Sequence, residues 1–111
     1  QLENLDRYVA DKRETAACYA EFFKGKEDIT FFTEPADCKS NYWLNAVVLK
    51  DKAAQLDFLE YTNDHGVMTR PVWELMNRLP MFEHCETDGL ENTEWLADRV
   101  VNIPSSVRLD K

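Results

Sequence analysis

The sequence has few cysteines, which form the disulfides of small secreted proteins, and few glycines, which form phosphate-binding turns. It has three cysteines and three glycines among 111 residues. The cysteine count is odd, and the spacings of Cys18, Cys38 and Cys85 match no disulfide framework, so we expect a reducing compartment and a cytoplasmic protein. No glycine-rich turn opens a helix, which leaves the chain without the usual backbone site for a cofactor phosphate.

Positive charge and long apolar runs are also scarce. The 13 lysines and arginines are outnumbered by 21 aspartates and glutamates, which gives a formal net charge of −8. An acidic surface repels phosphate backbones and anionic lipids, so we expect no nucleic acid and no membrane among the partners. No apolar run approaches the roughly 20 residues that span a bilayer, and no secretory leader is visible after Gln1.

What remains is an ordinary composition at the length of one domain. Hydrophobic residues make up 44% and charged residues 31% of the chain, which is typical of folded globular proteins. A chain of this length can bury a core without disulfides or metals. We therefore expect one folded domain over residues 1–111.

Hydrophobic periodicity and end signals predict three helices, over residues 2–24, 52–64 and 88–101. Gly25 stops the first helix. Asp51 is a suitable N-cap for the second, and Gly66 supplies the left-handed conformation just beyond its end. Asp88 and Glu91 have the spacing of an acidic capping box at the start of the third. The side chains that these helices should bury include Tyr19, Phe22, Phe23, Leu56, Leu59, Leu96, Ala97 and Val100.

Three strands are expected, over residues 29–32, 42–49 and 67–70. The segment 42–49 has the strongest signal, and both of its faces are largely apolar, which suits a strand covered on both sides. Pro71 closes the last strand, and residues 74–78 are expected to form a helical turn. The order of elements predicts an α+β fold: a small sheet of about three strands, packed on one face by a long N-terminal helix and two further helices.

Large apolar side chains are assigned to the core by residue type. Trp43 and Trp95 are expected to be buried, because aromatic rings dominate protein cores. Methionine fills irregular gaps in cores, and the same location is therefore expected for Met68, Met76 and Met81.

Five segments, in their order along the chain, resemble a known family. They are QLENLD (1–6), NYWLNA (41–46), NDHGVMTRPVW (63–73), LPMF (79–82) and ADRVVNIPSS (97–106). Together they resemble the carboxy-terminal part of the DegT/DnrJ/StrS aminotransferases. Within that family, the segments are most similar to the LegC-like enzymes that act on 4-keto nucleotide sugars.

The resemblance implies a fold and a function for a longer protein. This chain would be the carboxy-terminal small domain of a pyridoxal-phosphate enzyme of fold type I, and an upstream large domain would carry the Schiff-base lysine. The enzyme would be a homodimer with active sites at the subunit interface. Glutamate would donate the amino group, and the acceptor would be a UDP-linked 4-keto-6-deoxy-N-acetylhexosamine, used in surface-glycan or nonulosonic-acid synthesis.

The expected positions of the lysines also indicate that this chain is only part of an enzyme. A Schiff-base lysine must be desolvated so that its amine is neutral enough to attack. Surface, loop or terminal positions are expected for all seven: Lys12, Lys24, Lys26, Lys39, Lys50, Lys52 and Lys111. We therefore expect that the chain alone contains no catalytic residue, holds no pyridoxal phosphate covalently and does not transaminate.

Two residues near the end of the third predicted strand are candidates for substrate binding. A guanidinium at Arg70 could clamp a carboxylate or a phosphate through two hydrogen bonds, and by resemblance the segment that follows approaches the active site. The alternative for Arg70 is a structural salt bridge or an exposed strand end. Trp73 could stack on the sugar or the base of a substrate, or it could pack at a domain interface.

A zinc site is not expected. Cys38, His65, His84 and Cys85 contain no paired-cysteine or paired-histidine spacing. A metal-binding regulator is therefore the weakest of three functional hypotheses.

A stand-alone interaction or ligand-binding module is the main alternative to the aminotransferase domain. The two hypotheses predict different surfaces. A domain that docks on a larger one leaves an apolar patch exposed, whereas a stand-alone module should have a polar surface. Met81 and Phe82 distinguish the two, because only the docking domain requires them to be exposed.

Overall fold

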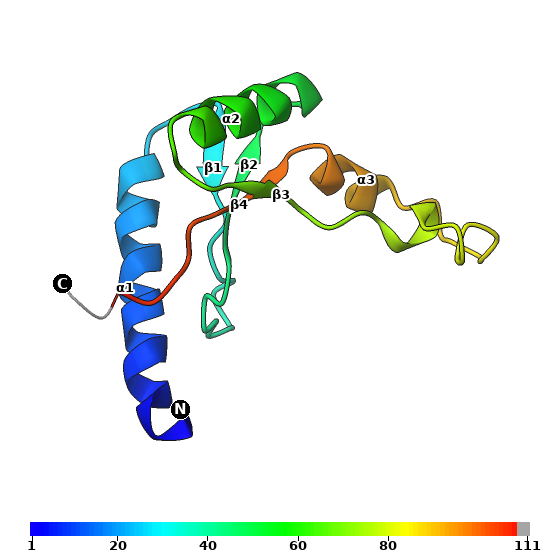
Figure 1. Ribbon diagram of the computed structural model, residues 1–111. Helices are drawn as coiled ribbons and strands as arrows, with labels where there is room; N and C mark the ends of the chain where they lie inside the picture. Colours follow the sequence, from blue (N-terminus) through cyan, green and yellow to red (C-terminus); the bar gives the residue numbers. More distant parts are fainter. Residues whose placement is uncertain (109–111) are drawn as a thin grey trace.

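The computed structural model describes residues 1–108, which form an α+β structure (Figure 1). The predicted α+β class is confirmed, with four strands instead of about three. The elements in chain order are η1 (Leu2–Asn4), α1 (Leu5–Phe23), β1 (Ile29–Phe31), β2 (Asn45–Leu49), α2 (Lys52–Asp64), β3 (Arg70–Pro71), η2 (Met76–Arg78), α3 (Glu91–Ala97) and β4 (Val100–Ile103). Lys111 lies outside the described residues.

The sheet has the order β1-β2-β4-β3, and every neighbouring pair is antiparallel. Strand β4 lies between β2 and β3, with Val47 opposite Val101 and Asn45 opposite Ile103. The prediction that residues 88–101 form one helix is wrong, because α3 ends at Ala97 and the chain then enters β4. β-Branched residues lose side-chain freedom in a helix and pack well on a pleated sheet, which explains why Val100, Val101 and Ile103 take the strand.

The core lies on one face of this sheet. Its buried members are Ala16, Phe31, Val47, Leu49, Val101 and Ile103. Side chains from both α1 and α2 pack against them, including Phe23 and Phe58. The two long helices therefore cover the same face. Contrary to the expectation for residues 42–49, the strand begins only at Asn45, and Ala46 and Val48 on its other face stay half-buried in the described chain.

The ends of α1 and α2 follow the local signals. The Asp51 side chain accepts a hydrogen bond from the Ala54 amide at 2.8 Å, as expected of an N-cap. Gly25 and Gly66 have φ values of +81° and +80°, which favour glycine. The start of α3 differs from the prediction: Asp88 accepts from the amide of Leu90 at 3.1 Å, and the helix begins at Glu91.

A glutamine takes the most buried position of α2. Gln55 is fully buried, whereas Leu56 is 53% exposed. The Gln55 amide nitrogen donates to the carbonyl oxygens of Ala97 and Val100, at 3.0 Å each. These carbonyls lie where α3 gives way to β4. The buried face of α2 is therefore offset by one residue from the predicted buried face. Gln55 takes this position because its side chain provides donors for backbone groups that would otherwise be unpaired.

Several side chains that were assigned to the core are exposed instead. The exposed fractions are 66% for Trp43, 49% for Trp95, 64% for Phe22, 39% for Leu96, 67% for Met68, 62% for Met76 and 61% for Met81. Most of them project from loops, from helix ends or from the short helix α3. No second layer of the described chain covers those segments. A prediction of burial from residue type alone was therefore wrong for these side chains.

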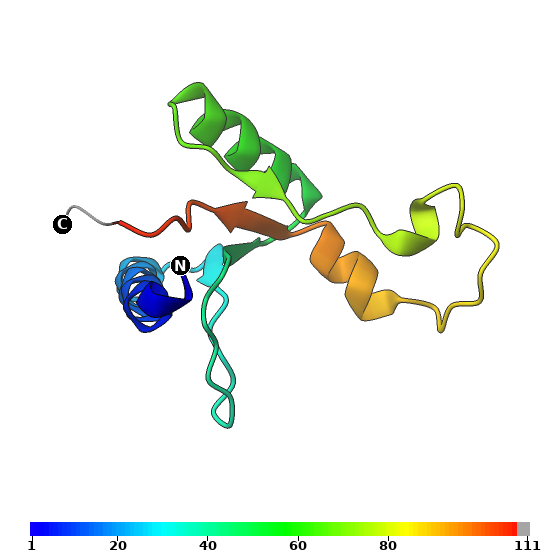
Figure 2. The ribbon, with the colours of Figure 1, turned by 60° about the horizontal axis from the view of Figure 1, so that its bottom comes forward.

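The described chain is extended for its size. Its radius of gyration is 16.0 Å, whereas a compact domain of about 100 residues has a value of roughly 13 Å. Figure 2 shows two segments that extend away from the sheet in different directions, the 32–44 loop and the arm formed by residues 72–90. No helix within residues 1–108 is both long enough and apolar enough to cross a membrane.

Candidate functional site

The sheet face opposite the core carries the first candidate residue. Directly paired residues of neighbouring antiparallel strands point to the same face. Arg70 of β3 pairs with Asn102 of β4, and Asn102 pairs with Ala46 of β2. The three side chains therefore form a row across the face that neither α1 nor α2 covers. Asn102 and Ala46 are half-buried, and Arg70 at the sheet edge is exposed.

The guanidinium of Arg70 is available to a ligand. Within residues 1–108 it forms no ion pair and no hydrogen bond to a side chain or a carbonyl. The alternative of a structural salt bridge thus finds no partner in the described chain. A guanidinium carries five donors in a rigid, planar arrangement that matches a carboxylate or a phosphate. Arg70 can therefore bind an anion without first breaking an internal contact.

Apolar side chains flank Arg70 on both sides along the chain. Met68 precedes it and is 67% exposed, and Trp73 follows it and is 70% exposed. Trp73 does not pack in the core of this domain, so its two open interpretations remain stacking on a ligand and packing at an interface. Further out on the arm, Met81 and Phe82 are 61% and 38% exposed. Exposure of these two side chains is what the docking-domain hypothesis predicts.

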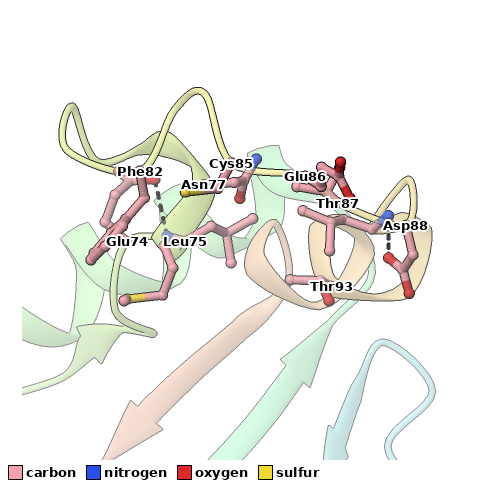
Figure 3. Close-up of a pocket in the computed structure, with 11 residues that line it drawn as sticks. Glu74, Leu75, Asn77, Phe82, Cys85, Glu86, Thr87, Asp88 and Thr93 are labelled. Carbon is pink, nitrogen blue, oxygen red and sulfur yellow. Dashed lines mark hydrogen bonds between the residues drawn. The ribbon is translucent and has the colours of Figure 1, made fainter.

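A cleft of about 630 Å³ opens between the arm and α3 (Figure 3). Its apolar lining comes from Leu75, Met76, Phe82 and Leu90. Three carboxylates also line it, those of Glu74, Glu86 and Asp88, and no lysine or arginine does. Because like charges repel, the cleft does not suit a diphosphate or a carboxylate ligand. Arg70 on β3, unlike this cleft, carries the positive charge that an anionic group would require.

An ion pair that the sequence did not reveal fixes the base of the 32–44 loop. Arg13 of α1 donates to both carboxylate oxygens of Glu34, at 2.8 and 3.0 Å. Arg13 also donates to the carbonyl of Ser40, and the Ser40 amide donates to Glu34. The ring of Tyr42 lies 5.6 Å from the Arg13 guanidinium carbon. Along the sequence, Lys12 and Arg13 interrupt the apolar stripe of the first helix, but nothing in the sequence indicates their partners.

This network changes the acidity of Glu34. The hydrogen bonds from Arg13, followed by the one from Ser40, lower the pKa of Glu34 to about 2. An unfolded glutamate has a pKa of about 4.3. Because the folded-state pKa is the lower one, ionised Glu34 stabilises the fold above about pH 4.5, and this stabilisation is lost as the pH falls towards 2.

We expect Glu34→Gln to lower the melting temperature at pH 6 and to have much less effect near pH 2, where the wild-type carboxylate is being protonated. Thermal unfolding of both proteins between pH 6 and pH 2 measures this. Glu74→Gln is the control, since Glu74 lies 3.6 Å from Arg78 in an exposed pair and exposed pairs contribute little. A gap between wild type and Glu34→Gln that stays constant with pH would contradict the assignment.

The described lysines are either exposed or hydrogen-bonded to backbone carbonyls. Lys12 is half-buried, and its ammonium donates to the carbonyls of Trp43 at 3.2 Å and Ser105 at 2.7 Å. That geometry suits a structural cation that joins α1 to the segment before β2 and the segment after β4. The other lysines within residues 1–108 are exposed: Lys24, Lys26, Lys39, Lys50 and Lys52. A nucleophilic amine requires desolvation instead.

Residues with metal-binding side chains do not come together in the described part of the chain. Among residues 1–108, no group of three or more His, Cys, Asp and Glu side chains is arranged to hold an ion. Cys38, His65, His84 and Cys85 are all exposed. The candidate functional surface therefore consists of Arg70 on the uncovered sheet face, with Trp73 and the exposed apolar side chains of the arm.

The chain is similar to a known family of enzymes. The family model for the DegT/DnrJ/EryC1/StrS aminotransferases matches residues 1–111. EpsN of Bacillus subtilis (strain 168), assigned as a pyridoxal phosphate-dependent aminotransferase, is 27% identical over 109 residues, which cover 95% of this chain and 28% of EpsN.

Solved structures share the fold. The sugar aminotransferase CalS13 from Micromonospora echinospora has a TM-score of 0.80 and 25% identity, over 99% of this chain and 29% of its own. The aminotransferase TlmJ from Streptoalloteichus hindustanus has a TM-score of 0.88 and 21% identity, over 100% and 30%. Helicobacter pylori PseC has a TM-score of 0.87 and 18% identity, over 99% and 30%.

This chain thus spans less than a third of the length of each of these relatives. The match to the family model, by contrast, extends over every residue of the chain, and the family that the five sequence segments indicated is confirmed. The chain belongs to the DegT/DnrJ/EryC1/StrS aminotransferase family.

Proposed function

We propose that this chain is the carboxy-terminal small domain of a pyridoxal-phosphate-dependent aminotransferase that acts on a 4-keto nucleotide sugar. The observation that carries the proposal is the surface around β3 and the arm. An unpaired guanidinium lies there among large exposed apolar side chains, on the sheet face that has no helix cover. Family membership supplies the reaction class.

The exposed apolar side chains support docking on a larger domain. Trp73 is 70% exposed and Met81 is 61% exposed, on an arm that extends away from the sheet (Figure 2). Soluble monomers rarely expose large apolar patches, and such patches mark interaction sites. A stand-alone module was expected to have a polar surface, so this surface favours the docking domain.

The chemistry divides between this chain and the rest of the protein. Pyridoxal phosphate, held by the large domain, would supply the electron sink through which an amino group passes from donor to acceptor. The large domain would also carry the Schiff-base lysine. We assign to this chain the binding and orientation of substrate: Arg70 binds an anionic group, and Trp73 either stacks on the substrate or closes the domain interface.

The substrates are proposed from the same resemblance. We infer glutamate as the amino donor and a UDP-linked 4-keto-6-deoxy-N-acetylhexosamine as the acceptor, as in the LegC-like branch. Two solved relatives support a sugar acceptor: CalS13 is a sugar aminotransferase, and PseC is an aminotransferase involved in the biosynthesis of pseudoaminic acid. The proposed product serves surface-glycan or nonulosonic-acid synthesis in the cytoplasm, and the proposed assembly is a homodimer.

The test begins with the native gene product. We expect a protein several times heavier than this 13.0 kDa chain. The purified complete protein, loaded with pyridoxal phosphate, is then incubated with glutamate and a panel of UDP-4-keto sugars, and 2-oxoglutarate is measured. Release that depends on the keto sugar is the expected result. A native product of 13 kDa, or a release that is the same without any keto sugar, would overturn the proposal.

A further inference from the structure

Three polar side chains join the end of α2 to the start of β3. Thr69 is 2% exposed, and its hydroxyl oxygen lies 2.7 Å from that of Thr62 and 3.0 Å from the amide nitrogen of Asn63. The Asn63 amide nitrogen also lies 2.8 Å from the carbonyl of Leu59. We call these three residues, Thr62, Asn63 and Thr69, the threonine clasp.

The numbers of donor hydrogens fix which group donates and which accepts in each hydrogen bond of the threonine clasp. The Asn63 amide is a donor, so the Thr69 hydroxyl accepts from it. The single proton of Thr69 then goes to Thr62, and the proton of Thr62 goes to the carbonyl of Phe58, at 2.7 Å. A hydroxyl has one donor hydrogen and two acceptor lone pairs, so every bond in this chain is made without conflict. A complete network of this kind holds its members in one arrangement.

Strand β3 depends on such support because it is short. It comprises only Arg70 and Pro71, which pair with Asn102 and Val101. Residues of an antiparallel strand alternate between hydrogen-bonded and non-hydrogen-bonded pairs, so of these two residues only Arg70 faces β4 with its backbone donor and acceptor, and Pro71 lies at the open edge. The chain reaches β3 after Gly66, where the amide of Val67 returns to the carbonyl of Thr62 at 2.8 Å. The side chain of Thr69 therefore supplies a connection that the backbone ladder does not.

The direction in which Arg70 points follows from this connection. Successive residues of a strand point to opposite faces, and a slip by one residue exchanges the faces. With Thr69 held against α2 on the core side, Arg70 must project from the opposite face. We propose that the threonine clasp is the positioning device for Arg70, and this inference rests on the proposed function, in which Arg70 binds an anionic substrate group.

The experiment compares two variants of Thr69 in the complete, cofactor-loaded protein. Thr69→Val removes the hydroxyl, and Thr69→Ser keeps it. Two probes present the two anions that Arg70 could recognise: UDP carries a diphosphate, and succinate carries two carboxylates. Calorimetry gives the dissociation constant of each probe for the wild type, for both variants, for Arg70→Ala and for the double variant Thr69→Val/Arg70→Ala.

We expect Arg70→Ala to weaken one probe about tenfold or more, since it removes a charge-assisted contact. Thr69→Val should weaken the same probe about fivefold and leave the other unchanged, whereas Thr69→Ser should restore binding. In the Arg70→Ala background, Thr69→Val should have no further effect, because residues that act through one contact are not additive. A purely structural role would not select one probe.

Different results would contradict the proposed role of Arg70 and the proposed role of the threonine clasp. If Arg70→Ala leaves both probes unchanged, the proposed role of Arg70 is wrong. If Arg70→Ala weakens a probe but Thr69→Val does not, or if Thr69→Val weakens both probes equally, the positioning role is wrong. Should Thr69→Val fail to fold, Asn63→Asp replaces it, because a carboxylate of the same shape supplies no donor to Thr69. Asn63→Asp must then weaken the same single probe as Arg70→Ala, and wild-type binding by this variant would reject the clasp.

Discussion

Replacing Phe31 by alanine should lower the free energy of unfolding of this chain by about 3–5 kcal/mol, the usual loss for a buried phenylalanine. Phe31 is 7% exposed. Its ring lies 5.8 Å from that of Tyr19 and is stacked 6.4 Å from that of Phe23. The residue thus joins α1 to the centre of the sheet, where it pairs with Val47. Domains are stable by only about 5–15 kcal/mol, so this loss is a large fraction of the total stability.

Urea denaturation of the chain, followed by circular dichroism, measures this effect. The neighbouring residue offers a matched control, because Phe32 is 58% exposed. Phe32→Ala removes the same side chain and should change the free energy of unfolding by less than about 0.5 kcal/mol. Equal losses in the two variants would show that the core does not centre on Phe31.

Replacing Arg70 by alanine in the complete protein should weaken binding of one anionic substrate about tenfold to a hundredfold. A hydrogen bond to a charged group contributes about 1.5–3 kcal/mol, and each 1.4 kcal/mol is about a factor of ten. Because Arg70 has no internal ion pair in the described chain, its loss should leave the fold intact. The melting temperature should therefore stay close to that of the wild type.

Steady-state kinetics with glutamate and the keto sugar varied in turn identifies the substrate that Arg70 binds. Arg70→Lys should recover only part of the affinity, since lysine keeps the charge and loses the planar pair of donors. Arg78→Ala is the control. Arg78 is also an exposed arginine, but it pairs at 3.6 Å with Glu74, which lines the acidic cleft. A similar loss in Arg78→Ala would mean that general positive charge, and not Arg70, is responsible.

Local chemistry accounts for the parts of the fold that were predicted well. Asp51 caps α2 through its own side chain, and Gly25 and Gly66 end the two long helices with positive φ. Each of these effects acts within a few residues of its cause, so it can be read directly along the chain.

The errors arose where distant segments decide the outcome. Val100 and Val101 of β4 were assigned to a helix because the preceding residues have helical signals. Only pairing with β2, more than 50 residues earlier, reveals that they belong to a strand. Gln55 was overlooked because its partners are carbonyls at the junction of α3 and β4. The exposed tryptophans and methionines were assigned to the core, although hydrophobic residue type does not by itself imply burial.

The candidate site shows the same division. The sequence indicated Arg70 and Trp73, because an arginine that ends a strand before a proline stands out along the chain. It did not indicate the Arg13–Glu34 pair, whose members are 21 residues apart, or the function of Thr69.

The sequence by itself determined the family, through five short segments in a fixed order, as well as the acidic surface charge and the ends of α1 and α2. Only the tertiary structure decided that both long helices share one face of the sheet, that β4 lies at its centre, and that Arg70 points to the face left uncovered. The physical reason is the separation along the sequence between the residues that interact. Helix caps and glycine conformations depend on neighbouring residues, whereas burial and the direction of a side chain depend on which strands pair and in which register.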